Sequence, residues 1–174
     1  MDNVGYDMVV VGGGHAGIEA ALSASRMGYQ CALVTLDAFK IGEMSCNPSI
    51  GGIGKGQLVR EIDALGGEMG RAADHTQIQA KMLNTRKGPA VQALRTQNDR
   101  KLYREHMCQV IHECSNIDVI EGEVVDIFTH NESISRVRLG SGAEIRTGSL
   151  VIATGTFLNG TMHHGMTQSD GGRN

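Results

Sequence analysis

The sequence predicts an α/β domain whose parallel sheet holds a ligand at the carboxyl ends of its strands. A short apolar run at 7–11 leads directly into a glycine-rich turn, a small-residue helix and a second apolar run at 31–36. A further apolar run, 149–155, ends at another small-residue turn. Continuous β-branched and apolar runs of this length are typical of strands buried on both faces of a parallel sheet.

The first turn, Gly-Gly-Gly-His-Ala-Gly at 12–17, satisfies the dinucleotide-binding pattern GxGxxG. Its first glycine permits a tight turn, its second lets the backbone approach a pyrophosphate, and its third allows close helix packing. We predict the helix over 17–27, ended by Gly28, with amides of its first turn facing the anion. His15 is expected to contribute through its backbone amide. The predicted cofactor-binding residues of this loop are Gly12, Gly13, Gly14, His15, Ala16 and Gly17.

The end of the second strand departs from the usual dinucleotide pattern. An acid normally follows the glycines by about 20 residues and binds the adenosine ribose. Here Thr35 holds that place and Asp37 follows it. The Thr35 hydroxyl could still bind the ribose, so this position does not decide between NAD and FAD.

The later part of the chain favours FAD. Short strands at 119–121, 124–128, 135–139 and 144–146 are separated by turn residues and predict a β-meander. The strand at 149–155 then ends in Ala-Thr-Gly. This order resembles the second signature of the two-dinucleotide-binding-domain flavoproteins, which implies a Rossmann-like FAD-binding domain with Val124 beside the adenine and Gly155 at a second nucleotide-facing turn. An ordinary glycine turn after a core strand is the alternative.

Composition indicates an ordinary single domain with an uneven charge distribution. The 174 residues carry a net charge of −3, but 81–104 hold seven basic side chains and one acid. We expect a basic helical segment here, including a helix over 96–114, which either contacts phosphate or is a solvated helix face. The early apolar run at 8–11 is far too short for a signal peptide or a membrane span, and the four cysteines form no CxxC pair, so we expect a cytosolic protein with free thiols.

A metal site is not expected on the predicted helix. His106, Cys108, His112 and Cys114 are candidate ligands by residue type. At 100° per residue only Cys108 and His112 share a face, so four ligands cannot converge.

The middle segment, 42–57, is too rich in glycine for a regular element and could reach a flavin ring. It is not a P-loop, because Ser49 stands where the first glycine is required and Gly56 replaces the magnesium-binding hydroxyl residue. Residues 44–56 (MSCNPSIGGIGKG), 61–67 (EIDALGG), 83–91 (LNTRKGPAV) and 12–17 closely resemble the MnmG (GidA) family of tRNA-modifying flavoenzymes.

This resemblance covers nearly the whole chain and implies FAD-dependent formation of 5-carboxymethylaminomethyluridine at the wobble position of tRNA. It also implies a GTPase partner, MnmE, in a heterotetramer, a homodimer, a folate one-carbon donor, and glycine or ammonium as the amine. NADH would be the reductant, binding outside this chain. Lys55 and the basic run 81–104 would then face tRNA phosphate.

Cys46 is the candidate catalytic residue, because its thiolate could add to carbon 6 of uridine or assist proton transfer. A small loop residue packed under the cofactor is the alternative. His163 and His164 have no predicted role.

We divide the chain, 1–174, into a strand-helix-strand unit at 1–36, an insertion at 37–115 and a β-meander with the second turn at 116–160. Because the family is several times longer, we expect a fragment that alone binds FAD weakly and does not modify tRNA. Two other functions remain open at this point: a small-molecule FAD oxidoreductase of the fumarate reductase kind, and a non-enzymatic remnant.

Overall fold

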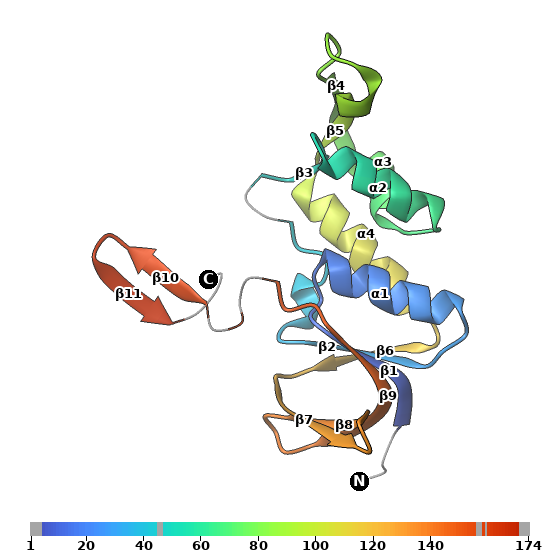
Figure 1. Cartoon of the computed structure of the whole chain (residues 1–174), viewed down its shortest axis with the longest axis vertical. Helices are drawn as coiled ribbons and strands as arrows, with labels where there is room; N and C mark the ends of the chain where they lie inside the picture. Colours follow the sequence, from blue (N-terminus) through green and yellow to red (C-terminus); the bar gives the residue numbers. More distant parts are fainter. Residues whose placement is uncertain (1–4, 45–46, 156–157, 159, 171–174) are drawn as a thin grey trace.

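The structure is a computed structural model that describes residues 5–44, 47–155, 158 and 160–170. It is elongated, with the parallel sheet toward one end and a β-hairpin at the other (Figure 1). Its elements are β1 Gly5–Val11, α1 His15–Arg26, β2 Cys31–Thr35, η1 Ala38–Lys40, β3 Ser49–Gly51, α2 Lys55–Ala64, α3 Met69–Thr76, β4 Gln77–Leu83, η2 Pro89–Val91, β5 Ala93–Asn98, α4 Arg100–Glu113, β6 Ile117–Glu121, β7 Val124–His130, β8 Ser133–Leu139, β9 Glu144–Ile152, β10 Thr161–His164 and β11 Thr167–Asp170.

The central sheet has the strand order β6-β2-β1-β9-β8-β7. The first four strands are mutually parallel, with Val9 beside Ala32 of β2 and beside Leu150 of β9. This order, third-second-first-fourth for the parallel strands, is that of a doubly wound nucleotide-binding sheet. The predicted fold class, an α/β Rossmann-like domain, is confirmed.

Two apolar layers cover the sheet. Alternate side chains of a strand point to opposite faces, so neighbours along β1 belong to different layers. Val10 and Leu33 pack on one face with α1 and α4, whereas Val9 and Ala32 pack on the other with Val137 of β8. The helix α4 buries Tyr103, Met107 and Ile111, which are spaced by four residues and therefore lie on one face.

Three strand predictions need correction. The segment 119–121 belongs to β6 and pairs in parallel with β2, so it joins the parallel sheet and not the meander. The meander consists of β7, β8 and the start of β9. Segments 144–146 and 149–152 are one strand, β9, which pairs with β8 at its start and with β1 further along, and the predicted strand ends before 153–155.

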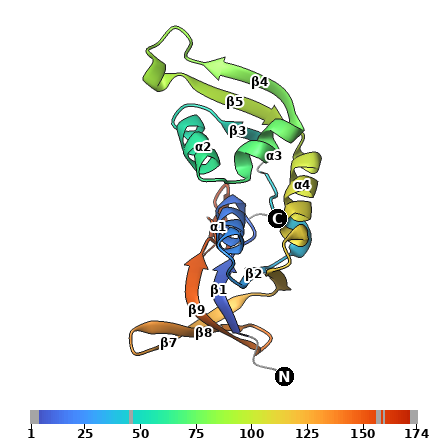
Figure 2. The same cartoon turned by 90° about the vertical axis from the view of Figure 1, so that its right-hand side faces the viewer.

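The insertion between β2 and α4 also differs from prediction. The glycine-rich segment 42–57 contains β3 and the start of α2, so part of it is regular structure. The predicted helix over 96–114 begins only at Arg100, because Asp99 caps it by accepting from the amides of Lys101 and Leu102. The residues before it form β4 and β5, an antiparallel hairpin that projects from the insertion (Figure 2). Most of the basic run is therefore hairpin and not helix.

Within the described residues, no helix combines the length and the apolarity that a membrane span requires.

Candidate functional site

The loop after β1 lies where the carboxyl ends of β1, β2 and β9 meet. The Gly12 amide donates to the Val34 carbonyl of β2 at 2.8 Å, and the Ala153 amide donates to the Val11 carbonyl at 2.8 Å. Gly12 has φ +114°, and a Cβ there would lie 2.3 Å from the Ala153 carbonyl oxygen. Only glycine fits this junction, because both the conformation and the space exclude a side chain.

Gly17 brings α1 against the loop. A Cβ at Gly17 would lie 1.8 Å from the Gly12 carbonyl oxygen, a backbone atom that cannot rotate away. The close approach of helix to turn expected for the third glycine of the motif is thus present in the structure.

Gly14 differs from both, since a Cβ built there meets nothing within 4 Å. It is the residue before α1, and the first intrahelical bond at this end runs from the Ile18 amide to the Gly14 carbonyl at 2.9 Å. The amides of residues 15–17 therefore have no hydrogen-bond acceptor within the helix, because no helical carbonyl precedes them. No acidic side chain lies in the first turn of α1, and no side chain caps it. Open space beside unpaired amides at a helix start suits a phosphate group.

The ring of His15 lies against α4. Its centroid is 5.5 Å from that of Tyr103, and its Nε2 is buried without a hydrogen-bond partner. Burial lowers the pKa of His15 from its ordinary value, so the ring is neutral at pH 7. The Tyr103 hydroxyl is likewise buried and unpartnered. This position agrees with a contribution of His15 to the loop through its backbone.

The opposite wall of the loop comes from β2 and the segment after it. The Gly42 amide donates to the Gly13 carbonyl at 2.9 Å, and a Cβ at Gly13 would lie 3.0 Å from both Thr35 Oγ1 and Ile41 Cγ1. Thr35 therefore faces the loop, where a ribose hydroxyl could reach it.

The two remaining predicted cofactor residues lie near the same sheet edge. The Gly122 amide donates to the Thr35 carbonyl at 2.8 Å, which places the turn before Val124 beside the end of β2. Val124 is half-buried and packs on the second face of the sheet. Gly155 follows β9 with φ +63° in an exposed turn. Their contacts with a nucleotide stay predictions.

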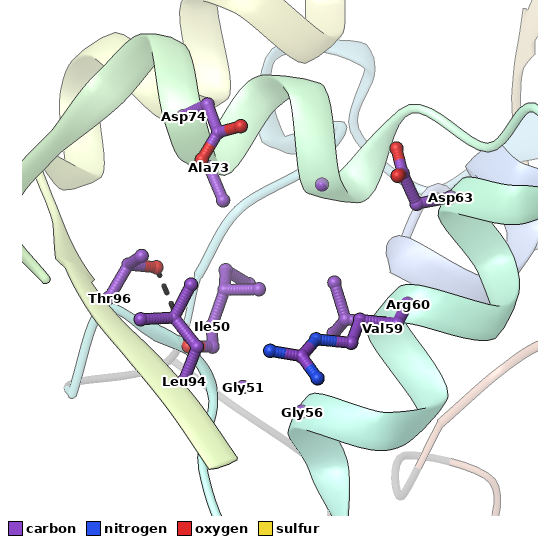
Figure 3. A pocket seen from close by; sticks show the side chains of 11 residues that line it. Ile50, Gly51, Gly56, Val59, Arg60, Asp63, Ala73, Asp74, Leu94 and Thr96 are labelled. Carbon is purple, nitrogen blue, oxygen red and sulfur yellow. Dashed lines mark hydrogen bonds between the residues drawn. The ribbon is translucent and has the colours of Figure 1, made fainter. Parts of the chain in front are cut away.

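Cys46, the candidate catalytic residue, lies outside the described residues. Further along the same segment, Gly51 and Gly56 line a cleft between α2, α3, β3 and β5 (Figure 3). The Arg60 side chain extends into this cleft from α2, which also carries Asp63, whereas Asp74 lies on α3 (Figure 3). None of residues 12–17 lines it, so the cleft is a place separate from the loop.

The four candidate metal ligands around α4 do not converge. The His106 Nε2 lies 2.9 Å from Glu68 Oε1, while the thiols of Cys108 and Cys114 donate to the carbonyls of Ile41 and Val110. Among the described residues, no group of three or more His, Cys, Asp or Glu side chains is arranged to hold a metal ion.

A buried polar junction between α1, α3 and α4 was not predicted from the sequence. The Glu19 carboxylate accepts from the amides of Glu68 and Met69 at 2.9 and 2.7 Å, so a side chain of α1 caps the start of α3. Glu68 is 6% exposed and pairs with His106 of α4. The local sequence around Glu19 does not indicate that its side chain caps another helix, because the amides that it binds lie about 50 residues away in the chain.

Comparisons with known proteins agree on one family. The sequence model of the family "Glucose inhibited division protein A" matches residues 7–174. The tRNA uridine 5-carboxymethylaminomethyl modification enzyme MnmG of Aquifex aeolicus is 56% identical over 168 residues, which are 97% of this chain and 27% of that enzyme. The chain thus spans about a quarter of the length of the curated relatives it matches.

Solved structures give the same result. Aquifex aeolicus GidA in its form I crystal superposes with a TM-score of 0.93 at 56% identity, over 97% of this chain and 28% of that one. The GidA-related protein of Thermus thermophilus shares the fold at 15% identity, with a TM-score of 0.64 over 94% of this chain and 59% of that one. The chain therefore belongs to the family of glucose inhibited division protein A.

Proposed function

We propose that this chain is the FAD-binding amino-terminal part of an enzyme that forms 5-carboxymethylaminomethyluridine at the wobble position of tRNA. The observation that carries the proposal is the 56% identity to a relative named for this modification, across 97% of the chain. The geometry of the glycine loop supports it independently, because it offers the features that a dinucleotide pyrophosphate requires.

FAD would lie across the carboxyl ends of β1, β2 and β9. The amides of residues 15–17 would donate to its pyrophosphate, because Gly14 leaves the approach open. Thr35 would bind the adenosine ribose, Val124 would lie beside the adenine, and Gly155 would line the second turn. The bound flavin supplies the two-electron redox chemistry, with NADH as the reductant, whereas the protein fixes its position and excludes water.

Cys46 would act on the uridine base. A thiolate that bonds to carbon 6 would shift the electron pair of the 5,6 double bond to carbon 5. Carbon 5 would then bond to the methylene carbon of the folate donor as the carbon–nitrogen π bond of that donor opens onto the folate nitrogen. Loss of the proton from carbon 5 and release of the thiolate restore the double bond. An alternative role of the same side chain is assistance in proton transfer.

The partners that we propose are those that the resemblance to the MnmG (GidA) family implies. They are the tRNA substrate, a GTPase of the MnmE kind in a heterotetramer, and a second copy of the enzyme in a homodimer. We propose a cytoplasmic location, where tRNA is modified. Lys55 and the part of the basic run that lies on the β4–β5 hairpin, 81–95, would contact tRNA phosphate, where charge attraction weakens as salt rises.

A chimera tests the proposal. Residues 1–174 would replace the corresponding part of Aquifex aeolicus MnmG, and mass spectrometry would measure the modified wobble nucleoside after reaction with tRNA and the GTPase partner. We expect bound flavin absorbance and modification, with Cys46→Ser keeping the flavin and losing the modification. A chimera that binds FAD fully yet leaves tRNA unmodified, while the parent relative modifies it, would contradict the proposed substrate. A folded chimera without flavin would contradict the proposed cofactor site.

A further inference from the structure

The hairpin formed by β4 and β5, residues 77–98, is the most one-sided charge feature of the described structure. It carries Lys81, Arg86, Lys87 and Arg95, and its sequence contains no Asp or Glu. In both views it stands at the end of the molecule opposite to β7 and β8 (Figures 1 and 2). Every residue from 85 to 91 is exposed, so its tip is open to a large partner.

Two of these charges face each other across the strands. Lys81 of β4 is the direct register partner of Arg95 of β5. Like charges directly opposite in a sheet destabilise it, so this pair opposes the formation of the hairpin. In the part of the chain that the structure describes, none of the ion pairs involves a basic side chain of the hairpin. The hairpin therefore presents a concentrated positive charge that the protein itself does not neutralise.

The basic residues of α4, which follow in the same run of sequence, behave differently. Arg100 pairs with Glu43, and Lys101 lies 3.7 Å from Glu105 on the next turn of the helix. The structure thus separates the hairpin cations, none of which is in an ion pair of the described residues, from Arg100 and Lys101 of α4, which have acidic partners. Arg104 of α4 is in none of these ion pairs either. Sequence alone could not make this division, because all seven charges appear equivalent in it.

The base of the hairpin is firmly attached to the body. Asn98, 1% exposed, donates through Nδ2 to the Ala73 carbonyl at 2.8 Å and to Thr76 Oγ1 at 3.1 Å. Its own Oδ1 accepts from Thr96 Oγ1 at 2.8 Å. The hairpin is therefore tied to the body at its base, whereas β4 beyond it is exposed over nearly its whole length.

The composition of the hairpin restricts what it can bind. It has no aromatic side chain, so it lacks the ring platforms on which readers of single-stranded RNA stack bases. Lysine and arginine side chains without neighbouring acids bind the phosphates of a nucleic acid irrespective of its sequence.

We propose that the β4–β5 hairpin is an RNA-binding arm that contacts the phosphate backbone of tRNA through Lys81, Arg86, Lys87 and Arg95, while the paired cations Arg100 and Lys101 of α4 take no part. This inference rests on the proposed function, because that function supplies the RNA substrate. It assigns the contact to one element and predicts that the contact positions the tRNA without reading its bases.

The test compares two triple variants of the purified chain that lose the same charge. The arm variant is Lys81→Gln, Arg86→Gln, Lys87→Gln, and the control is Lys40→Gln, Arg100→Gln, Lys101→Gln, in which every replaced cation has an acidic partner. Anisotropy of a dye-labelled tRNA gives the affinity between about 50 and 200 mM KCl. We expect the arm variant to lose at least about tenfold in affinity and to reduce the slope of log K against log salt by about 2. The control should change the slope by less than about 1.

Three outcomes would overturn the inference. Equal losses in both variants would show that net charge and not the arm determines the affinity. A slope unchanged in the arm variant, with circular dichroism showing that it is folded, would exclude phosphate contacts there. Displacement of the tRNA by polyglutamate as effective as by unlabelled RNA would show a site for acidic polymers in general. A parent chain that binds no tRNA would contradict the tRNA part of the proposed function itself, whereas FAD titration by flavin fluorescence checks the cofactor site separately.

Discussion

The glycine loop at 12–17 and the hairpin at 77–98 differ in what surrounds their backbones. In the loop, backbone meets backbone: a Cβ at Gly17 would lie 1.8 Å from the Gly12 carbonyl oxygen. In the hairpin, β4 is exposed over nearly its whole length, and its side chains meet solvent. The loop is therefore sensitive to single atoms, whereas the hairpin depends on its attachment at the base and on the sum of its charges.

The largest effect is expected at the loop. In Gly17→Ala the added methyl group would lie 1.8 Å from the Gly12 carbonyl oxygen, so α1 must move away from the sheet. We expect a loss of about 3–5 kcal/mol in the free energy of unfolding, measured by urea denaturation, because the clash is with backbone. Ala16→Gly, an exposed neighbour in the first turn of the same helix, is the control and should cost about 1 kcal/mol or less. A Gly17→Ala variant as stable as the parent would contradict the packing described here.

A smaller effect is expected at the base of the hairpin. Asn98→Ala removes a side chain that serves three partners and leaves the Ala73 carbonyl and two threonine hydroxyls without it. We expect a loss of about 2–3 kcal/mol, because buried polar groups become unsatisfied. Gln97→Ala on the same strand should cost about 0.5 kcal/mol or less, since it is only half-buried.

Hydrogen exchange would separate this local effect from global loss. Faster exchange confined to the amides of β4 and β5 is the expected result for Asn98→Ala. Uniformly faster exchange in β1 and β2 as well would mean that the hairpin and the sheet form one cooperative unit, and the comparison between the two regions would fail.

The same contrast explains which parts of the fold could be predicted from the sequence. The loop has local signals: apolar residues before it, three glycines at fixed spacing and small residues after it. The glycine end of α1 was also predictable, and Gly28 has φ +85°. Segment 117–121 could not be assigned to the parallel sheet, because its pairing with β2 joins residues 86 apart, Cys31 with Ile117.

The hairpin was mispredicted although local signals were present. Residues 77–82 alternate between polar and apolar side chains, with Ile78, Ala80 and Met82 on one face, which is typical of a strand. Aspartate is a favoured N-cap residue, and Asp99 marks the start of α4. The basic charges and the helix that follows suggested a single helical segment instead. For the site, the glycines were predictable, but the contact of His15 with Tyr103 was not, since it depends on how α1 and α4 pack.

Gly14→Ala should affect binding and leave stability nearly unchanged. Gly14 has φ −78°, which alanine adopts readily, and nothing lies within 4 Å of a Cβ there. The unfolding free energy should stay the same or rise by up to about 1 kcal/mol, because alanine restricts the unfolded chain. FAD affinity, measured by quenching of flavin fluorescence, should fall by about tenfold, since the methyl group occupies the approach to the amides. Unchanged FAD affinity would place the pyrophosphate elsewhere.

The smallest effect is a pH dependence at the contact between α1 and α4. Burial lowers the pKa of His15 below its ordinary value of 6.5. Between the folded pKa and 6.5, the unfolded chain therefore binds more protons at this residue than the folded chain does. The stability that the neutral His15 ring contributes is complete above pH 6.5. It is lost as the pH falls through 6.5 toward the pKa of His15 in the folded chain. Tyr103, the titratable group against its ring, stays neutral throughout, because burial raises its pKa.

His15→Phe keeps a ring against Tyr103 and removes the titrating group. Urea denaturation between pH 8 and pH 5, about the range in which histidine titrates, should show a smaller loss of stability on acidification in this variant than in the parent. His164→Gln, at an exposed position on β10, should follow the parent curve and controls for loss of any histidine. Parallel curves for His15→Phe and the parent would mean that His15 titrates equally in the folded and unfolded chains. The burial of the His15 ring against Tyr103 would then have no effect on its protonation.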